Sequence, residues 1–172
     1  MKPVMTTALG LALAGCTTTA GSREAVTVVI PEQGGELVRQ CSRTGPEGAH
    51  SFFTPRAREI TAVETATAKA LRGVSSQDYI SPRDSDLLAF DWPDDPSLYN
   101  RQYVGYVRDG RRKIYGNFVP TRFGPSSSEP VVVCDGGPSL FGVEFDILSG
   151  TVERIAFNGG RGGPFFPDIE PD

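Results

Sequence analysis

Two hairpin patterns in the second half of the chain limit its fold more than any other part of the sequence. In the first, residues 101–108 (RQYVGYVR) and 112–119 (RKIYGNFV) flank Asp109-Gly110, a dipeptide that suits a tight type I′ turn. In the second, residues 141–146 (FGVEFD) and 151–157 (TVERIAF) flank a turn at Leu148-Ser149-Gly150. Together they predict an antiparallel sheet.

The second hairpin also indicates how this sheet is buried, because successive side chains of a strand point to opposite faces. Its apolar face carries Phe141, Val143, Phe145, Ile155 and Phe157, and its other face carries Gly142, Glu144 and Asp146. This alternation is typical of an antiparallel sheet with one buried face. Such a face needs another element to cover it.

Residues 54–73 predict the one clear helix of the chain. Thr54 suits the N-cap, Pro55 suits the first helical position, and Gly73 is a stop signal. Apolar residues recur at helical spacing, namely Ile60, Val63, Ala70, Leu71 and Val74. We therefore predict an α+β fold in which one main helix packs on an antiparallel β-sheet built largely from two C-terminal hairpins.

Shorter segments complete a single domain predicted over residues 25–158. A first strand, a turn, an extended piece and a further strand are expected at Ala25–Ile30, Gln33–Gly35, Leu37–Cys41 and Pro130–Cys134, respectively. Residues 74–100 lose periodicity and predict a surface loop. The Gly- and Pro-rich residues 159–172 predict a flexible tail.

The chain begins with an export signal. Lys2 precedes a short apolar run that ends at Leu13-Ala14-Gly15-Cys16, and this run is much shorter than the ~20 residues of a membrane-spanning helix. The segment resembles the lipobox of bacterial lipoprotein precursors, in which cleavage falls before the cysteine and the cysteine carries the lipid. The resemblance implies a signal peptide over residues 1–15 and a lipidated tether over residues 16–24, anchored through Cys16.

The same resemblance implies a location. Position 17 is Thr rather than Asp, which in this family favours delivery to the outer membrane. We expect acyl chains such as palmitate on Cys16 to hold the protein on the outer membrane, facing the periplasm. Two or three acyl chains anchor a protein firmly, whereas one chain binds only marginally. The alternative is an ordinary secretory signal that ends in a cysteine by chance.

Three motifs in the second half carry a further resemblance. RQYVG at 101–105, VCDGG at 133–137 and FGVEFD at 141–146 are similar to sequences in small uncharacterised proteobacterial lipoproteins. The resemblance covers the C-terminal part of the chain. It implies an exported α+β domain and no particular activity.

Charge and cysteine content bound the partners and the compartment. Cleavage before Cys16 leaves 157 residues with 16 basic and 21 acidic side chains, a net charge of −5, which argues against nucleic acid as a partner. The remaining cysteines, Cys41 and Cys134, are expected to form a disulfide bond, as even counts in exported chains usually do. The alternatives are two free thiols or one reactive nucleophile.

No catalytic, cofactor or metal set is recognisable in the sequence. His50 is the single histidine and lies in a polar segment, so a solvated role is expected for it rather than a catalytic one. Zinc would need a cluster of His and Cys ligands that this chain does not offer. Five carboxylates that could suit calcium occur close together, but their spacing does not fit an EF-hand loop; they are Asp84, Asp86, Asp91, Asp94 and Asp95.

The first hairpin offers the best candidate binding surface, because tyrosine and arginine are enriched in interface hot spots. The surface would comprise Tyr103, Tyr106, Arg108, Arg112 and Tyr115. The competing interpretation is that some of the tyrosines belong to the core while the charges solvate the hairpin tip.

These observations predict a location more firmly than an activity. We expect a membrane-anchored periplasmic lipoprotein that acts as a non-catalytic envelope binding module, with an envelope protein as its partner and no cofactor. One alternative is an inhibitor or immunity protein against an effector that attacks the envelope. The other is a hydrolase of envelope polymers, which the lack of a catalytic set disfavours.

Overall fold

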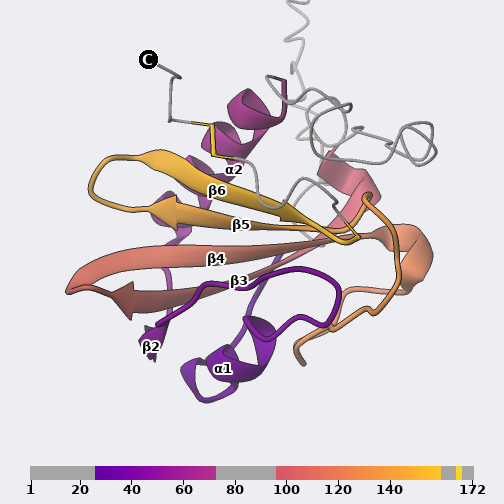
Figure 1. Ribbon diagram of the computed structural model, residues 1–172, viewed down its shortest axis with the longest axis horizontal. Coiled ribbons are helices and arrows are strands. Elements are labelled where there is room, and N and C mark those ends of the chain that lie inside the picture. Colours follow the sequence, from indigo (N-terminus) through magenta and orange to yellow (C-terminus); the bar gives the residue numbers. More distant parts are fainter. Residues whose placement is uncertain (1–25, 73–95, 160–165, 168–172) are drawn as a thin grey trace, which may run out of the picture.

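A computed structural model describes residues 26–72, 96–159 and 166–167. In them the chain forms a six-stranded mixed sheet with few helices (Figure 1). The strands are β1 (Val26–Val28), β2 (His50–Phe53), β3 (Tyr99–Arg108), β4 (Arg111–Pro120), β5 (Phe141–Asp146) and β6 (Thr151–Phe157). The helices are α1 (Gly34–Leu37) and α2 (Ala57–Arg72), with 3-10 turns at Pro31–Gln33, Pro96–Leu98 and Thr121–Phe123. The predicted α+β fold class is confirmed.

The sheet has the strand order β1-β3-β4-β5-β6, and β2 also pairs with β3. Along one edge of β3, the first half pairs in parallel with β1 and the second half pairs antiparallel with β2. The pairs β3–β4, β4–β5 and β5–β6 are antiparallel. The antiparallel prediction is therefore correct for the two hairpins, and β1 adds a parallel pair to them.

Both predicted hairpins are present. The β3–β4 turn is formed by Asp109 and Gly110, whose φ angles of 52° and 71° are the positive values that a type I′ turn requires. β5 and β6 have the predicted bounds, residues 141–146 and 151–157. The five apolar residues predicted to share a face all lie in one core cluster, so the apolar face is predicted correctly.

The predicted helix is confirmed as α2, but its start differs. It begins at Ala57, after Thr54 and Pro55, because its first turn is closed in another way. The carboxylate of Glu59 accepts a hydrogen bond from the backbone N–H of Arg56 at 2.7 Å. Arg56 directly precedes the helix, so this is the capping-box bond in which the third helical residue accepts from the N–H of the N-cap residue.

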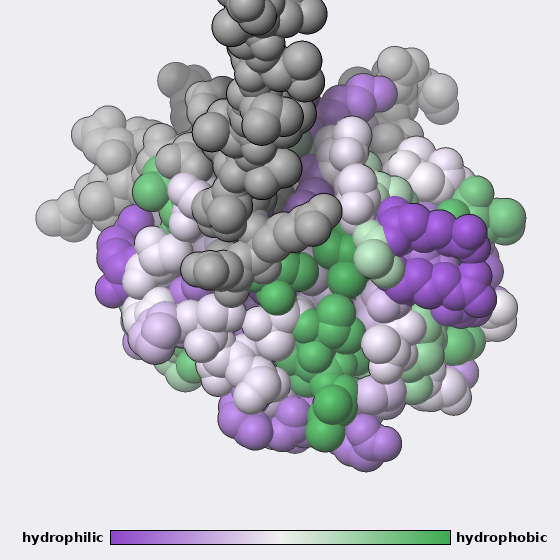
Figure 2. All heavy atoms as spheres, turned by 180° about the vertical axis from the view of Figure 1, so that it is seen from behind, coloured by the Kyte–Doolittle hydropathy of each residue, from purple (hydrophilic) through white to green (hydrophobic). Residues whose placement is uncertain are grey.

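α2 packs its apolar side against one face of the sheet. Ile60, Val63 and Leu71 are buried there, as predicted. They join a core in which the rings of Phe118 and Phe141 stack with their centroids 4.6 Å apart. On the back of the molecule, apolar surface shows as a central strip bordered by hydrophilic side chains (Figure 2).

The opposite face of the sheet is also covered, so the predicted single buried face is wrong. All six residues of β5 are buried. α1 and the loop after it lie on the near side of the sheet in Figure 1, while α2 lies behind. A second apolar cluster forms beneath them from Val29, Leu37, Val104, Tyr106 and Tyr115. The polar side chains of this face therefore lie inside the domain.

Residues 33–41 do not form the predicted turn and extended piece. The segment 34–37 is the short helix α1, and Val38 still has helical backbone angles. Gly34 allows this helix to approach β2, since a Cβ atom there would lie 2.5 Å from the ring of Phe52. The conformation of residues 34–37 depends on close packing against β2, which the spacing of residues in the sequence does not predict.

Several predictions concern residues outside the described ranges. They are the signal peptide and tether over 1–24, most of the loop over 74–100 with its aspartates, Val74, and nearly all of the tail over 159–172.

Candidate functional site

Arg43 is the centre of the polar face of the sheet. It enters from the loop between α1 and β2 and is 9% exposed. Its Nε donates to the hydroxyl of Tyr115 at 3.2 Å and its Nη1 to Oδ1 of Asn158 at 2.5 Å, while Nη2 donates to Oδ1 of Asn117. Three neutral acceptors therefore hold one cation in a fixed orientation inside the domain.

Side-chain amides on the same face bind the backbone of residues 127–133. Gln102 Oε1 accepts from the N–H of Val131 at 2.9 Å, and Asn117 Nδ2 donates to the Val131 carbonyl at 2.9 Å. Further bonds run from Gln102 Nε2 to the Ser127 and Glu129 carbonyls and from Asn158 Nδ2 to the Val133 carbonyl. These side chains occupy backbone N–H and carbonyl groups that, in a β-strand, would bond to the backbone of a neighbouring strand. Residues 131–134 are therefore not a sheet strand, and the strand predicted at Pro130–Cys134 is wrong.

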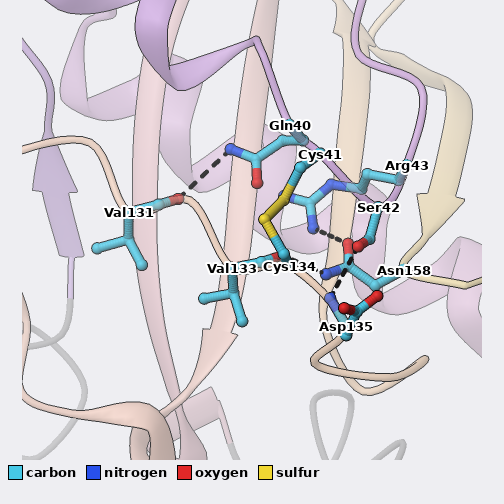
Figure 3. The surroundings of a disulfide bond; sticks show 9 residues. All are labelled: Gln40, Cys41, Ser42, Arg43, Val131, Val133, Cys134, Asp135 and Asn158. Atoms are coloured by element: carbon cyan, nitrogen blue, oxygen red, sulfur yellow. Dashed lines mark hydrogen bonds between the residues drawn. A yellow bond between two sulfur atoms is a disulfide. The ribbon is translucent and has the colours of Figure 1, made fainter.

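The predicted disulfide is confirmed and joins the two segments that cover this face. Cys41 and Cys134 are bonded across 93 positions of sequence, with their Cα atoms 5.4 Å apart. Both residues are exposed. Beside them, Ser42 accepts a hydrogen bond from the backbone N–H of Asp135 at 2.8 Å (Figure 3). The disulfide thus joins the 38–49 loop, which carries Arg43, to the 125–135 segment.

A cluster of charged side chains lies at the hairpin end of the same face. Glu144 accepts from Arg108 at 2.6 Å and from the hydroxyl of Tyr106 at 2.8 Å. It also pairs with Arg154, which donates to the Gly45 carbonyl at 2.6 Å. Burial, and then the nearby Glu144 carboxylate, raise the pKa of Tyr106 well above its ordinary value. Tyr106 therefore stays a neutral donor to Glu144.

Asp146 is the second acid of this cluster. Its Oδ2 lies 3.2 Å from Nζ of Lys113 and 2.8 Å from the guanidinium of Arg111. Its Oδ1 accepts from the backbone N–H groups of Leu148 and Ser149 at 2.8 and 3.1 Å. Burial alone would raise the pKa of Asp146, but these donors hold it below its ordinary value. The carboxylate thus fixes the β5–β6 turn.

The predicted binding surface on the first hairpin does not form as an exposed tyrosine–arginine patch. Tyr103, Tyr106 and Tyr115 are 0%, 0% and 2% exposed, because both faces of the sheet are covered. Arg108 is bonded to Glu144. Arg112 is exposed, and its guanidinium lies 4.1 Å from the centre of the Phe53 ring. The tyrosines belong to the interior of the domain.

The described residues hold no other recognisable chemistry. His50 is exposed at the start of β2, and its Nδ1 lies 3.0 Å from the Gly48 carbonyl. In the ranges 26–72, 96–159 and 166–167, no group of three His, Cys, Asp or Glu side chains is placed to hold a metal. No helix within those ranges has the length and apolar character needed to cross a bilayer.

An open pocket of about 560 Å³ lies between α1, the 38–49 loop and β2. Its walls include Val38 and Phe52, and Arg39, Arg43 and Glu47 are its charged lining residues. Arg43 is a candidate functional residue that no sequence pattern indicates. It has no periodic or motif partner, and only its position two residues after Cys41 places it near a structural element.

Protein-family models, curated proteins and solved structures give no match to this chain.

Proposed function

We propose that this chain is a lipid-anchored, non-catalytic binding module of the bacterial envelope, held by Cys16 on the periplasmic face of the outer membrane. The Cys41–Cys134 disulfide is the observation that supports this best, since stable disulfides belong to oxidising compartments such as the periplasm. It agrees with the export signal that the sequence predicts to end at Leu13-Ala14-Gly15-Cys16.

Binding is proposed rather than catalysis because the buried ionisable groups of the described residues are engaged in contacts within the domain. Glu144, Asp146 and Lys113 are each committed to ion pairs or hydrogen bonds within the domain. Arg43 is held by three neutral acceptors beside an open pocket. A cation held in this way, on a residue that lines a preformed pocket, is typical of ligand-binding sites.

The anchor is tested by replacing the acylated cysteine. Cys16→Ser should move the protein from the membrane fraction to the soluble periplasmic fraction and abolish incorporation of a labelled palmitate analogue. The control is the double variant Cys41→Ser/Cys134→Ser, which should stay on the membrane and keep its label. A Cys16→Ser protein that remains wholly in the membrane fraction would refute the anchor.

The binding role is tested with the purified mature chain carrying Cys16→Ser. Incubated with isolated envelopes, this chain should sediment with them in a saturable way and release no soluble fragments of envelope polymer. Release of such fragments in proportion to time and protein concentration would identify a hydrolase instead. Failure to sediment at any concentration would refute envelope binding.

A further inference from the structure

We propose that the pocket between α1 and the 38–49 loop binds a carboxylate ligand, with Arg43 as its buried countercharge. This inference deepens the proposed function, because it gives the binding module a site and a ligand class. It rests on the charge balance around Arg43 and on the shape and lining of the pocket. The membrane anchor plays no part in it.

Arg43 is a buried cation without a carboxylate partner in the described residues. Other buried cations differ: Arg101 lies 3.5 Å from Glu64, and Lys113 lies 3.2 Å from Asp146. The three acceptors of Arg43 are two amides and a hydroxyl. Neutral acceptors satisfy hydrogen bonds but leave the charge uncompensated, and an uncompensated buried charge is costly. An anion in the adjacent pocket would remove this cost.

The guanidinium is also prepared to receive such an anion. Of its five N–H groups, three are used by Tyr115, Asn117 and Asn158. These bonds fix the side chain, so little conformational entropy is lost when a ligand binds. The two remaining N–H groups have no partner in the described part of the chain.

The pocket itself is held in shape by its surroundings. Gly45 approaches the Val38 carbonyl so closely that a Cβ atom there would overlap it. Arg154 donates to the Gly45 carbonyl at 2.6 Å and so ties the loop to β6. The loop is tied again at Cys41 by the disulfide. A pocket of about 560 Å³ falls in the range of small-molecule sites.

The lining favours a singly charged carboxylate over a multiply charged anion. Arg39 and Arg43 face one acid, Glu47, so the charged lining residues sum to +1. A phosphate would bring more negative charge than this balance accepts and would be repelled by Glu47. Val38 and Phe52 supply apolar walls that suit the carbon body of an organic acid. In an envelope, this chemistry occurs at protein C-termini and in the peptides of the cell wall.

The test is a titration of the mature Cys16→Ser chain, followed by NMR or calorimetry. The probes are N-acetyl-L-alanyl-L-alanine, N-acetyl-D-alanyl-D-alanine, the two matching C-terminal amides and inorganic phosphate. At least one acid should bind about tenfold or more tightly than its amide, a difference equal to about 1.4 kcal/mol. Preference for the L,L acid assigns the ligand to protein C-termini, and preference for the D,D acid to cell-wall peptides.

Variants locate the binding. Arg43→Gln should abolish the preference for acid over amide, and Thr44→Trp, at an exposed lining position, should weaken binding of both. Arg58→Gln, on exposed α2, is the matched control and should bind as the parent chain does. If Arg43→Gln does not fold, the pocket is tested with Arg39→Gln and Thr44→Trp, which should bind the acids more weakly than the parent chain does.

Three results would overturn the proposal. They are equal binding of acid and amide, tighter binding of phosphate than of either acid, and full retention of binding in the folded pocket variants. The envelope-sedimentation and Cys16 experiments read out separate properties. If Cys16→Ser stays in the membrane fraction but the acid binds, only the proposed location is refuted. If Cys16→Ser leaves the membrane but the acid does not bind, only the proposed ligand is refuted.

Discussion

The guanidinium of Arg43 rests on the backbone of Gly142. A Cβ atom added to Gly142 would lie 2.9 Å from Nε of Arg43 and would also overlap the hydroxyl of Tyr115. Gly142 is in β5 on the face turned away from α2, and its neighbour across the ladder is Asn117, which binds the same guanidinium. A glycine at the second position of β5 thus makes the space for the buried arginine.

Replacing this glycine should therefore destabilise the domain. Gly142→Ala must displace Arg43 or Tyr115 and break part of their hydrogen-bond network. Overpacking of this kind costs about 1–3 kcal/mol. Urea denaturation of the mature Cys16→Ser chain measures the change as a lower midpoint with an unchanged slope.

Gly35→Ala is the matched control. A Cβ atom at Gly35 would meet the Phe52 ring at 3.7 Å, an ordinary contact, and Gly35 lies in α1 where alanine is the better helix former. Its unfolding midpoint should equal or exceed that of the parent chain. Equal midpoints for Gly142→Ala and the parent would contradict the close packing of Arg43 on β5.

The Cys41–Cys134 disulfide should contribute strongly to stability. It joins residues 93 positions apart, and a closed loop of that length is worth about 4–5 kcal/mol in the chain-entropy model. Reduction of the mature Cys16→Ser chain should lower its unfolding free energy by an amount of this order. Cys41→Ser/Cys134→Ser should match the reduced parent chain, and a midpoint insensitive to reductant would contradict the prediction.

Glu144 should be the most sensitive acid of the charged cluster. It is buried and serves Tyr106, Arg108 and Arg154 together. Glu144→Gln leaves Arg154 without a carboxylate partner in the described residues and Arg108 with Glu153 alone, and breaking such a buried pair costs about 3–5 kcal/mol. Glu129→Gln, at an exposed position, should have little effect on the urea midpoint. Similar midpoints for the two variants would contradict the role of Glu144.

Local sequence signals predicted the hairpins and the main helix, because these elements are defined by nearby residues. The Asp109-Gly110 turn and the alternation along β5 specify pairing that depends on residues close in sequence. The predicted start of α2 is too early, because the Glu59 carboxylate, not the Thr54 side chain, caps the first turn. The hairpin turns and the start of α2 are therefore determined by residues a few positions apart in the sequence.

Long-range contacts account for what the sequence could not predict. The Pro130–Cys134 segment has the composition of a strand, yet Gln102 and Asn117 bind its backbone in place of a neighbouring strand. Tyr106 and Tyr115 are buried because α1 and the 38–49 loop cover their face. Arg43 acquires its place only when Asn117 and Asn158 are brought together. The spacing of residues along the chain does not predict these long-range contacts.

Asp146 gives the domain a specific dependence on acid. The backbone N–H groups of the turn and the ammonium of Lys113 hold its folded pKa below the ordinary value of 3.8, so the folded chain releases this proton more readily than the unfolded chain. The stability contributed by Asp146 is therefore complete above the unfolded pKa and is lost as pH falls through the folded pKa.

Asp146→Asn should remove this contribution. The variant should be less stable than the parent at neutral pH, by about 1–3 kcal/mol for the lost charged hydrogen bonds. It should also lose less unfolding free energy than the parent between about pH 5 and about pH 2, as measured by urea denaturation at several pH values. Asp109→Asn, in the exposed turn of the other hairpin, should keep the parent profile, because asparagine also suits that turn. Parallel pH profiles for Asp146→Asn and the parent chain would show that Asp146 does not set the acid sensitivity.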